Sequence, residues 1–240
     1  SRCQAISDKQ YCKAESGWTR GRKFVMDSQS DYDLNIELIF PTAIGIVDND
    51  NFEDHSTLLD LEYKVTEASY GQFETTTDSY VLDNHVPNLR NWIQQQLDNF
   101  SKYALSTHQK LKLTQSWCLK HNNSIQQVFP HPHPNSIISG AYYVAAEEES
   151  ANLTFHKKNV NMSPSVIWEM DQEMLAQAPW NFHWKKFESK QGRLIMFPSQ
   201  LMHSVDGNKP VDGTRCVLSF NTWFEGGIGE VNKLNRLGPI

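Results

Sequence analysis

A run of alternating histidine and proline, Phe129-Pro130-His131-Pro132-His133-Pro134, constrains the fold more than any other stretch of this chain. Each proline fixes its own φ and pushes the residue before it out of the α region, so the run is expected to be stiff and extended. Proline also lacks the N–H that a central strand must donate, which predicts a sheet edge or a barrel mouth. Residues two apart in an extended segment point to one side, so His131 and His133 should face the same spot.

The chain after residue 110 has the rhythm of short β-strands separated by turns. Turn-forming groups such as Gln191-Gly192 and Asp206-Gly207-Asn208 separate runs of apolar and β-branched residues. The predicted strands cover residues 111–121, 137–145, 152–156, 193–197 and 215–224. Several short strands without helices between them are typical of an antiparallel sandwich or a jelly roll.

The rest of the chain predicts one helix and two irregular regions. Apolar residues recur at helical spacing at Val86, Leu89, Ile93, Leu97 and Phe100. Residues 1–33 are polar and without periodicity, so they are expected to form a flexible N-terminal extension to a domain of residues 34–240, with an edge strand near 37–47. The aromatic stretch 168–184, within a long insertion, is either a lid over the site or a packed surface excursion.

Composition and charge narrow the class of protein. A chain of 240 residues fits one large domain or one domain with an appendage, and its net charge of −6 disfavours nucleic acid as a partner. No apolar run reaches the ~20 residues that a membrane span needs. Cys118 and Cys216 lie in apolar strand-like runs and no Cys-x-x-Cys pair occurs. Buried thiols of this kind suit a reducing, cytoplasmic setting.

Two later residues give the histidine–proline run a chemical meaning. His203 follows the predicted strand at 193–197, and Arg215 opens the next one. Imidazole is a good ligand for iron, so His131, His133 and His203 are candidate catalytic metal ligands. A planar guanidinium binds a carboxylate through two parallel hydrogen bonds, and Arg215 would be costly to bury without such a partner. The simpler interpretations are an exposed turn and a surface arginine.

In motif and in order, the chain resembles the 2-oxoglutarate- and iron(II)-dependent oxygenases, in particular a bacterial and phage branch of them. The resemblance covers roughly residues 34–224. The stretches that carry it are Ser116-Trp117, His131-Pro132-His133-Pro134-Asn135-Ser136, Ser139-Gly140-Ala141-Tyr142-Tyr143-Val144, Gly192-Arg193-Leu194-Ile195-Met196-Phe197-Pro198-Ser199, His203-Ser204-Val205 and Arg215 to Asn221.

The resemblance implies a mainly β fold, a double-stranded β-helix (a jelly-roll or cupin-like barrel) with a few packing α-helices. It implies iron(II), 2-oxoglutarate as cosubstrate and dioxygen, with decarboxylation of 2-oxoglutarate coupled to C–H oxidation. By match, His131 and His203 are metal ligands, and Arg215 and Tyr143 hold the distal carboxylate of 2-oxoglutarate. Ser139 is expected to line the cofactor pocket on the side of Tyr143.

His133 departs from the family pattern, because the family usually has Asp or Glu at this position. His133 is therefore either a third imidazole ligand or a residue behind the ligands. Two other functions remain open: a cupin-like three-histidine metalloprotein that does not use 2-oxoglutarate, and a non-catalytic barrel that serves as a binding module. The substrate, a small molecule or a peptide, is not identified by the sequence, and a homodimer is one assembly compatible with it.

Overall fold

The computed structural model describes residues 41–68, 71–122, 128–147, 151–157, 182–206, 214–228 and 235–236. The chain divides into two units, Ser1–Thr42 and Ala43–Ile240, and the described residues lie almost wholly in the second unit. The predicted extension 1–33 lies outside them, as does most of the predicted lid, of which only 182–184 is described.

Antiparallel strands dominate the described part of the chain, as the turn-separated runs predicted. The larger sheet has seven strands in the order β1-β9-β6-β11-β4-β3-β2. The smaller sheet has four strands in the order β5-β10-β7-β8, and β12 pairs with β13. The bounds of the strands are β1 Gly45–Asp48, β2 Tyr63–Ala68, β3 Gly71–Thr76, β4 Leu111–Asn122, β5 Val128–His131, β6 Ile138–Ala145, β7 Asn152–His156, β8 Trp184–Phe187, β9 Arg193–Pro198, β10 His203–Asp206, β11 Thr214–Phe224, β12 Gly227–Ile228 and β13 Asn235–Arg236.

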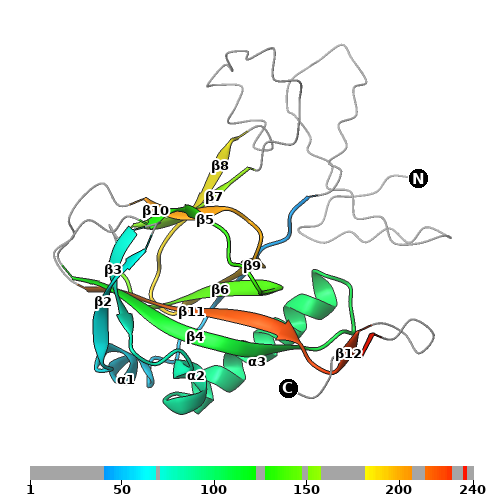
Figure 1. Ribbon diagram of the computed structural model, residues 1–240, viewed down its shortest axis with the longest axis horizontal. Coiled ribbons are helices and arrows are strands. Elements are labelled where there is room, and N and C mark those ends of the chain that lie inside the picture. Colours follow the sequence, from blue (N-terminus) through cyan, green and yellow to red (C-terminus); the bar gives the residue numbers. More distant parts are fainter. Residues whose placement is uncertain are drawn as a thin grey trace, which may run out of the picture. The chain divides into compact units, whose positions relative to one another are not determined.

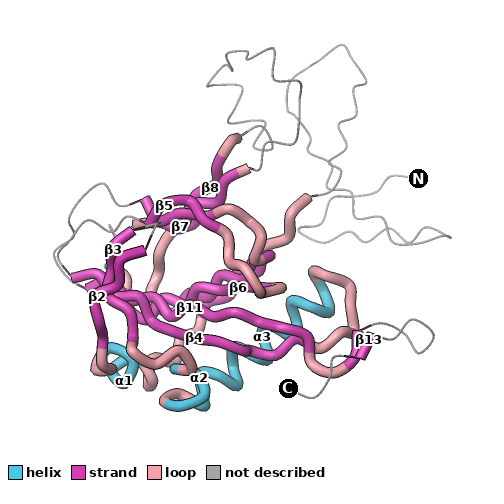
Figure 2. Tube along the Cα trace, in the orientation of Figure 1, coloured by secondary structure: helices cyan, strands magenta, loops and turns pink. Residues whose placement is uncertain are grey.

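The two main sheets face each other, and the helices cover the outer face of the larger one (Figure 1 and Figure 2). The helices are α1 His55–Leu59, α2 Val81–Asn84 and α3 Pro87–Tyr103. The five apolar residues that predicted α3 are all buried, and they pack with residues of β4, β6 and β11 into one core. Pro87 stands in the first turn of α3, where the missing N–H costs nothing. This arrangement confirms the predicted jelly-roll fold with a few packing helices.

Alternation along β11 divides its side chains between the core and the space between the sheets. Cys216, Leu218 and Phe220 pack into the core beneath the helices. Arg215 and Val217, on the opposite side, line a cavity between the two sheets. Close packing at the centre of the larger sheet requires a glycine, because a Cβ at position 140 would lie 2.2 Å from the ring of Phe220. β11 therefore presents Arg215 to the cavity, while the side chains on its other face stay closely packed in the core.

Candidate metal and anion site

The histidine–proline run lies at the sheet edge that its prolines predicted. The run begins in β5, which is an edge strand of the smaller sheet. After β5 the chain leaves the sheet, but the backbone N–H of His133 still donates to the carbonyl of Ser199 at 2.9 Å. Asn135 then turns the chain towards β6 with a φ of 56°, a conformation that asparagine tolerates better than most residues. Both imidazoles of the run line the cavity.

Strand pairing brings His203 to the other two histidines. His203 of β10 is the cross-strand partner of His131 of β5, and their ring centroids lie 4.5 Å apart. His133 lies 5.0 Å from His203 and 5.5 Å from His131 between ring centroids. One potential ligand atom from each of the three side chains lies within 4.8 Å of the others. Residues far apart in the sequence thus form one cluster with the spacing of a metal site.

Hydrogen bonds to carbonyl oxygens fix the tautomer of all three imidazoles. The Nδ1 of His131 contacts the carbonyl of Phe129 at 2.8 Å, and the Nδ1 of His203 contacts that of Leu201 at 2.9 Å. The Nδ1 of His133 lies 2.9 Å from Oδ1 of Asn221. A carbonyl oxygen only accepts, so each Nδ1 carries the proton and each Nε2 carries the lone pair. Partners of this kind orient metal-binding histidines and raise their basicity.

Burial keeps the three imidazoles neutral at physiological pH. Burial, together with a smaller contribution from the neighbouring imidazoles, lowers the pKa of His133 to about 4 and the pKa of His203 to about 3. Burial also lowers the pKa of His131. A neutral imidazole is the form that binds a metal ion, so these ligands need not lose a proton first.

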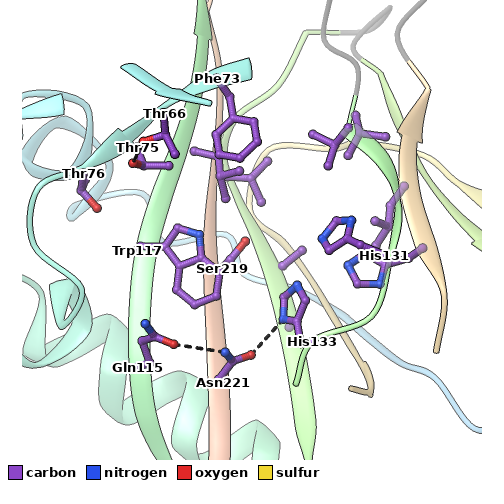
Figure 3. Close-up of a pocket in the computed structure, with 18 of the residues that line it drawn as sticks. Thr66, Phe73, Thr75, Thr76, Gln115, Trp117, His131, His133, Ser219 and Asn221 are labelled. Atoms are coloured by element: carbon purple, nitrogen blue, oxygen red, sulfur yellow. Dashed lines mark hydrogen bonds between the residues drawn. The ribbon is translucent and has the colours of Figure 1, made fainter. Parts of the chain in front are cut away.

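Asn221 holds His133 in place, and the sequence alone gave it no role. Its Oδ1 accepts from His133 and, at 2.8 Å, from the hydroxyl of Ser139, while its Nδ2 donates to Gln115 at 3.2 Å. Figure 3 shows the chain of contacts from Gln115 through Asn221 to His133. The strand alternation that puts Asn221 on the side of Arg215 was the one available signal.

The expected place of Ser139 needs correction. Ser139 is not among the residues that line the cavity. Its hydroxyl is fully buried and engaged with Ser199 and Asn221, both at 2.8 Å. Ser139 therefore supports Asn221 from behind, because neighbouring side chains cover its position on the strand.

Replacing Asn221 by leucine should weaken metal binding without unfolding the protein. Leucine has similar volume but cannot accept from His133, whose ring would then lose its fixed orientation. Loss of such a partner costs about 10- to 100-fold in metal affinity. Competition with a chelator of known affinity measures the change, and Asn221→Asp, which keeps an acceptor, is the matched control. Equal affinities for the leucine variant and the wild type would contradict this role.

Arg215 carries a positive charge into the same cavity. Its side chain is 3% exposed, and within the described part of the chain no carboxylate pairs with it. Burial lowers the pKa of Arg215, and its Nε has no hydrogen-bond partner among the described residues. The guanidinium carbon lies 5.5 Å from the centre of the Tyr143 ring, and the Tyr143 hydroxyl is likewise without a described partner. An unpaired buried charge is costly, so the site is suited to an anion.

One cavity of about 660 Å³ contains both the histidine cluster and Arg215. Trp117, Phe197 and Tyr143 contribute aromatic walls, and no acidic residue lines the cavity among the described residues. Tyr142, the neighbour of Tyr143, instead packs in the core beneath the helices. Its hydroxyl forms a hydrogen bond with Nε2 of His55. The cavity therefore offers three neutral ligands at one position and the buried cation of Arg215 at another, the donor set for a metal ion and a bound anion.

Comparison with known proteins supports this interpretation. Residues 115–221, which carry all three histidines and Arg215, match the model of a family described as "Putative 2OG-Fe(II) oxygenase". No curated protein sequence matches the chain significantly.

Solved structures with low sequence identity share the fold. The α-ketoglutarate-dependent epimerase SnoN from nogalamycin biosynthesis is 12% identical, with a TM-score of 0.53, over 78% of this chain and 80% of that one. The carbocyclase SnoK from the same biosynthesis is 11% identical, with a TM-score of 0.53, over 78% and 81%. EctD from S. alaskensis, solved with bound Fe, is 13% identical, with a TM-score of 0.50, over 75% and 72%.

The family match covers the strands that bear the candidate site, and the fold of those strands is the jelly roll of these enzymes. Residues 115–221 are therefore similar in sequence to the family described as "Putative 2OG-Fe(II) oxygenase", and the fold of the chain is shared with solved α-ketoglutarate-dependent enzymes.

Proposed function

We propose that this enzyme uses 2-oxoglutarate and iron(II) to hydroxylate a C–H bond of a small-molecule or peptide substrate. The observation that carries the proposal is the buried, unpaired Arg215 in the same cavity as the three-histidine cluster. The cluster alone fits many metalloproteins, whereas the added cation favours an organic anion that spans from the metal to Arg215. The family match supports the same class of cosubstrate.

The three histidines fit iron(II) by their chemistry and their fixed tautomers. His131, His133 and His203 would hold the ion through Nε2, because Nδ1 of each ring is used by a carbonyl oxygen. When bound, iron(II) and 2-oxoglutarate supply the oxidising chemistry, in which one oxygen atom enters succinate and the other enters the substrate. Phe197, in ring contact with His133 and His203, shields this end of the cavity from water.

Arg215 and Tyr143 fit the far carboxylate of 2-oxoglutarate. The guanidinium can donate two parallel hydrogen bonds to a carboxylate, and the Tyr143 hydroxyl can donate a third. Both side chains have polar atoms that no described residue satisfies, so ligand oxygen atoms would complete their bonding. Their roles are to bind and orient the cosubstrate, and to replace its water shell with fixed donors.

His133 distinguishes this site from the family pattern and favours one alternative. A third imidazole in place of a carboxylate leaves the ligand set one unit more positive, as in a cupin-like three-histidine metalloprotein that needs no keto acid. The non-catalytic barrel is the remaining alternative. Arg215 separates these functions from the proposed one, because neither alternative requires a buried cation beside the metal.

Anaerobic titration tests the proposed function directly. Adding 2-oxoglutarate to the folded, iron(II)-loaded protein should produce the visible charge-transfer absorption of a chelated keto acid, with one equivalent bound. Metal binding without this absorption, and without heat of 2-oxoglutarate binding, would favour the cupin-like alternative. Absence of stoichiometric metal in a protein purified without chelator would favour the non-catalytic barrel.

The setting and partners of the enzyme remain predictions. Cys118 and Cys216 are buried, free thiols, which fits the predicted reducing cytoplasm. Among the described residues, no helix combines the length and the apolar character needed to cross a bilayer.

A further inference from the structure

His121 is a buried histidine that the proposed chemistry does not yet use. It lies on β4 directly across from Arg215 of β11, as its cross-strand partner. Its side chain is 2% exposed and lines the same cavity as Arg215 and Tyr143. Neither Nδ1 nor Nε2 of His121 has a hydrogen-bond partner among the described residues.

Unsatisfied polar atoms are concentrated at this end of the cavity. The described residues include five buried side-chain nitrogen and oxygen atoms without a partner. Four of the five belong to His121, Tyr143 and Arg215, and the fifth is the hydroxyl of Ser101. Each such atom costs free energy unless a ligand or water completes its bonding. Their concentration on three side chains of one cavity indicates a single shared ligand.

His55 shows that burial alone does not leave a histidine without partners. It is 5% exposed, yet its Nε2 contacts the Tyr142 hydroxyl at 2.8 Å and its Nδ1 contacts Gln191 at 3.2 Å. Outside the cavity, the fold thus supplies hydrogen-bond partners to both nitrogens of a buried imidazole.

We propose that His121 is a third hydrogen-bond donor, with Arg215 and Tyr143, to the distal carboxylate of the cosubstrate, and that it contributes to selection for a dicarboxylate. This inference rests on the proposed function. A carboxylate has about four lone-pair sites, so it can accept from the guanidinium, the phenol and the imidazole together.

The charge state of His121 suits this role. Burial, and then the positive charge of Arg215, lower the pKa of His121 to about 4. The ring is therefore neutral in the ligand-free protein and offers one N–H without adding a second buried cation. Phe73, which is in ring contact with His121, is apolar and offers no hydrogen-bond acceptor.

Binding measurements with two keto acids separate recognition of the carboxylate from a structural role. 2-Oxoglutarate and 2-oxovalerate share the metal-chelating end and the chain length, but 2-oxovalerate lacks the distal carboxylate. For the anaerobic iron(II)-loaded protein, His121→Leu should weaken 2-oxoglutarate binding by about tenfold, the loss expected for one charge-assisted hydrogen bond. The affinity for 2-oxovalerate and the bound iron should be unchanged. His121→Gln, which keeps an N–H donor, should recover much of the 2-oxoglutarate affinity.

A second measurement observes His121 directly in the wild-type protein, without substituting it. In the zinc(II)-loaded wild type, which is diamagnetic, the imidazole ¹⁵N and N–H resonances of His121 should shift on adding 2-oxoglutarate and stay in place with 2-oxovalerate. His121→Gln assigns the signal, and His55→Gln controls for the loss of a buried histidine elsewhere.

Three outcomes would overturn the inference. If His121→Leu binds 2-oxoglutarate as the wild type does, or loses both keto acids equally, the residue does not recognise the distal carboxylate. An imidazole signal that does not respond to 2-oxoglutarate would lead to the same conclusion. In all three cases wild-type protein still binds 2-oxoglutarate, whereas failure of the wild type to bind it overturns the proposed function itself.

Discussion

The Arg215→Ala variant is expected to lose 2-oxoglutarate binding by roughly a thousandfold, because truncating one partner of a buried, hydrogen-bonded charge pair costs several kcal/mol. Iron binding should persist, since Arg215 is not part of the histidine cluster. Anaerobic calorimetry with the iron-loaded variant measures both quantities. Arg90→Ala, which removes a partly exposed arginine paired with Asp83, is the matched control and should bind 2-oxoglutarate as the wild type does.

Loss of the Arg215 charge should have the opposite effect on the ligand-free fold. Arg215 is a buried cation without a described carboxylate partner, and replacing such a charge by an apolar side chain is often neutral or stabilising. We therefore expect Arg215→Met to unfold at the same temperature as the ligand-free wild type or above it. A variant that keeps 2-oxoglutarate turnover would contradict the assignment of Arg215 and would favour the cupin-like alternative.

The His203→Ala variant is expected to bind less than about a tenth of the iron that the wild type binds, because a three-ligand site that loses a ligand with a fixed tautomer loses most of its affinity. His203 is also the cross-strand partner of His131, so its ring is held by the sheet itself. Metal content after anaerobic loading and gel filtration measures the effect. His85→Ala removes an exposed histidine that pairs with Asp78, and it should leave the bound iron unchanged.

Substitution of His133 determines whether that residue is a ligand. His133→Asp should retain iron, because a carboxylate oxygen is a suitable ligand at the same position, whereas His133→Ala should lose it. If His133→Ala retained stoichiometric iron, His133 would belong behind the ligands and the site would hold iron through two imidazoles.

The sequence predicted those helices and strands whose apolar residues recur at the spacing of their buried face. The apolar stripe of α3 and the strands β4, β6, β7, β9 and β11 were expected within one or two residues of their observed bounds. Strands β2 and β3 were missed because they are short and mostly polar, with too few apolar residues to give a clear alternation. The prolines correctly predicted the edge position of β5, since the missing N–H groups exclude a central strand.

Only those features of the candidate site that depend on neighbouring residues in the sequence were predictable. Pro132 and Pro134 restrict the histidine run locally, so the convergence of His131 and His133 was accessible from the sequence. Asn221 and His121 act through neighbours on other strands, and register decides those neighbours. The ladder between β11 and β6 is irregular between Cys216 and Val217, which no sequence rule foresees. Ser139 was misplaced because alternation gives the side of a strand but not what covers it.

The pairing of His131 with His203 joins β5 to β10 at one end of a short, irregular ladder. A cation bound to both rings would add a second link between β5 and β10, beside their backbone pairing. Backbone amides of β5 would then exchange with solvent more slowly when the cation is present, and local opening would precede its release. Part of the free energy of metal binding would therefore stabilise the pairing of β5 with β10, so that metal binding and the ordering of this edge of the barrel would be coupled.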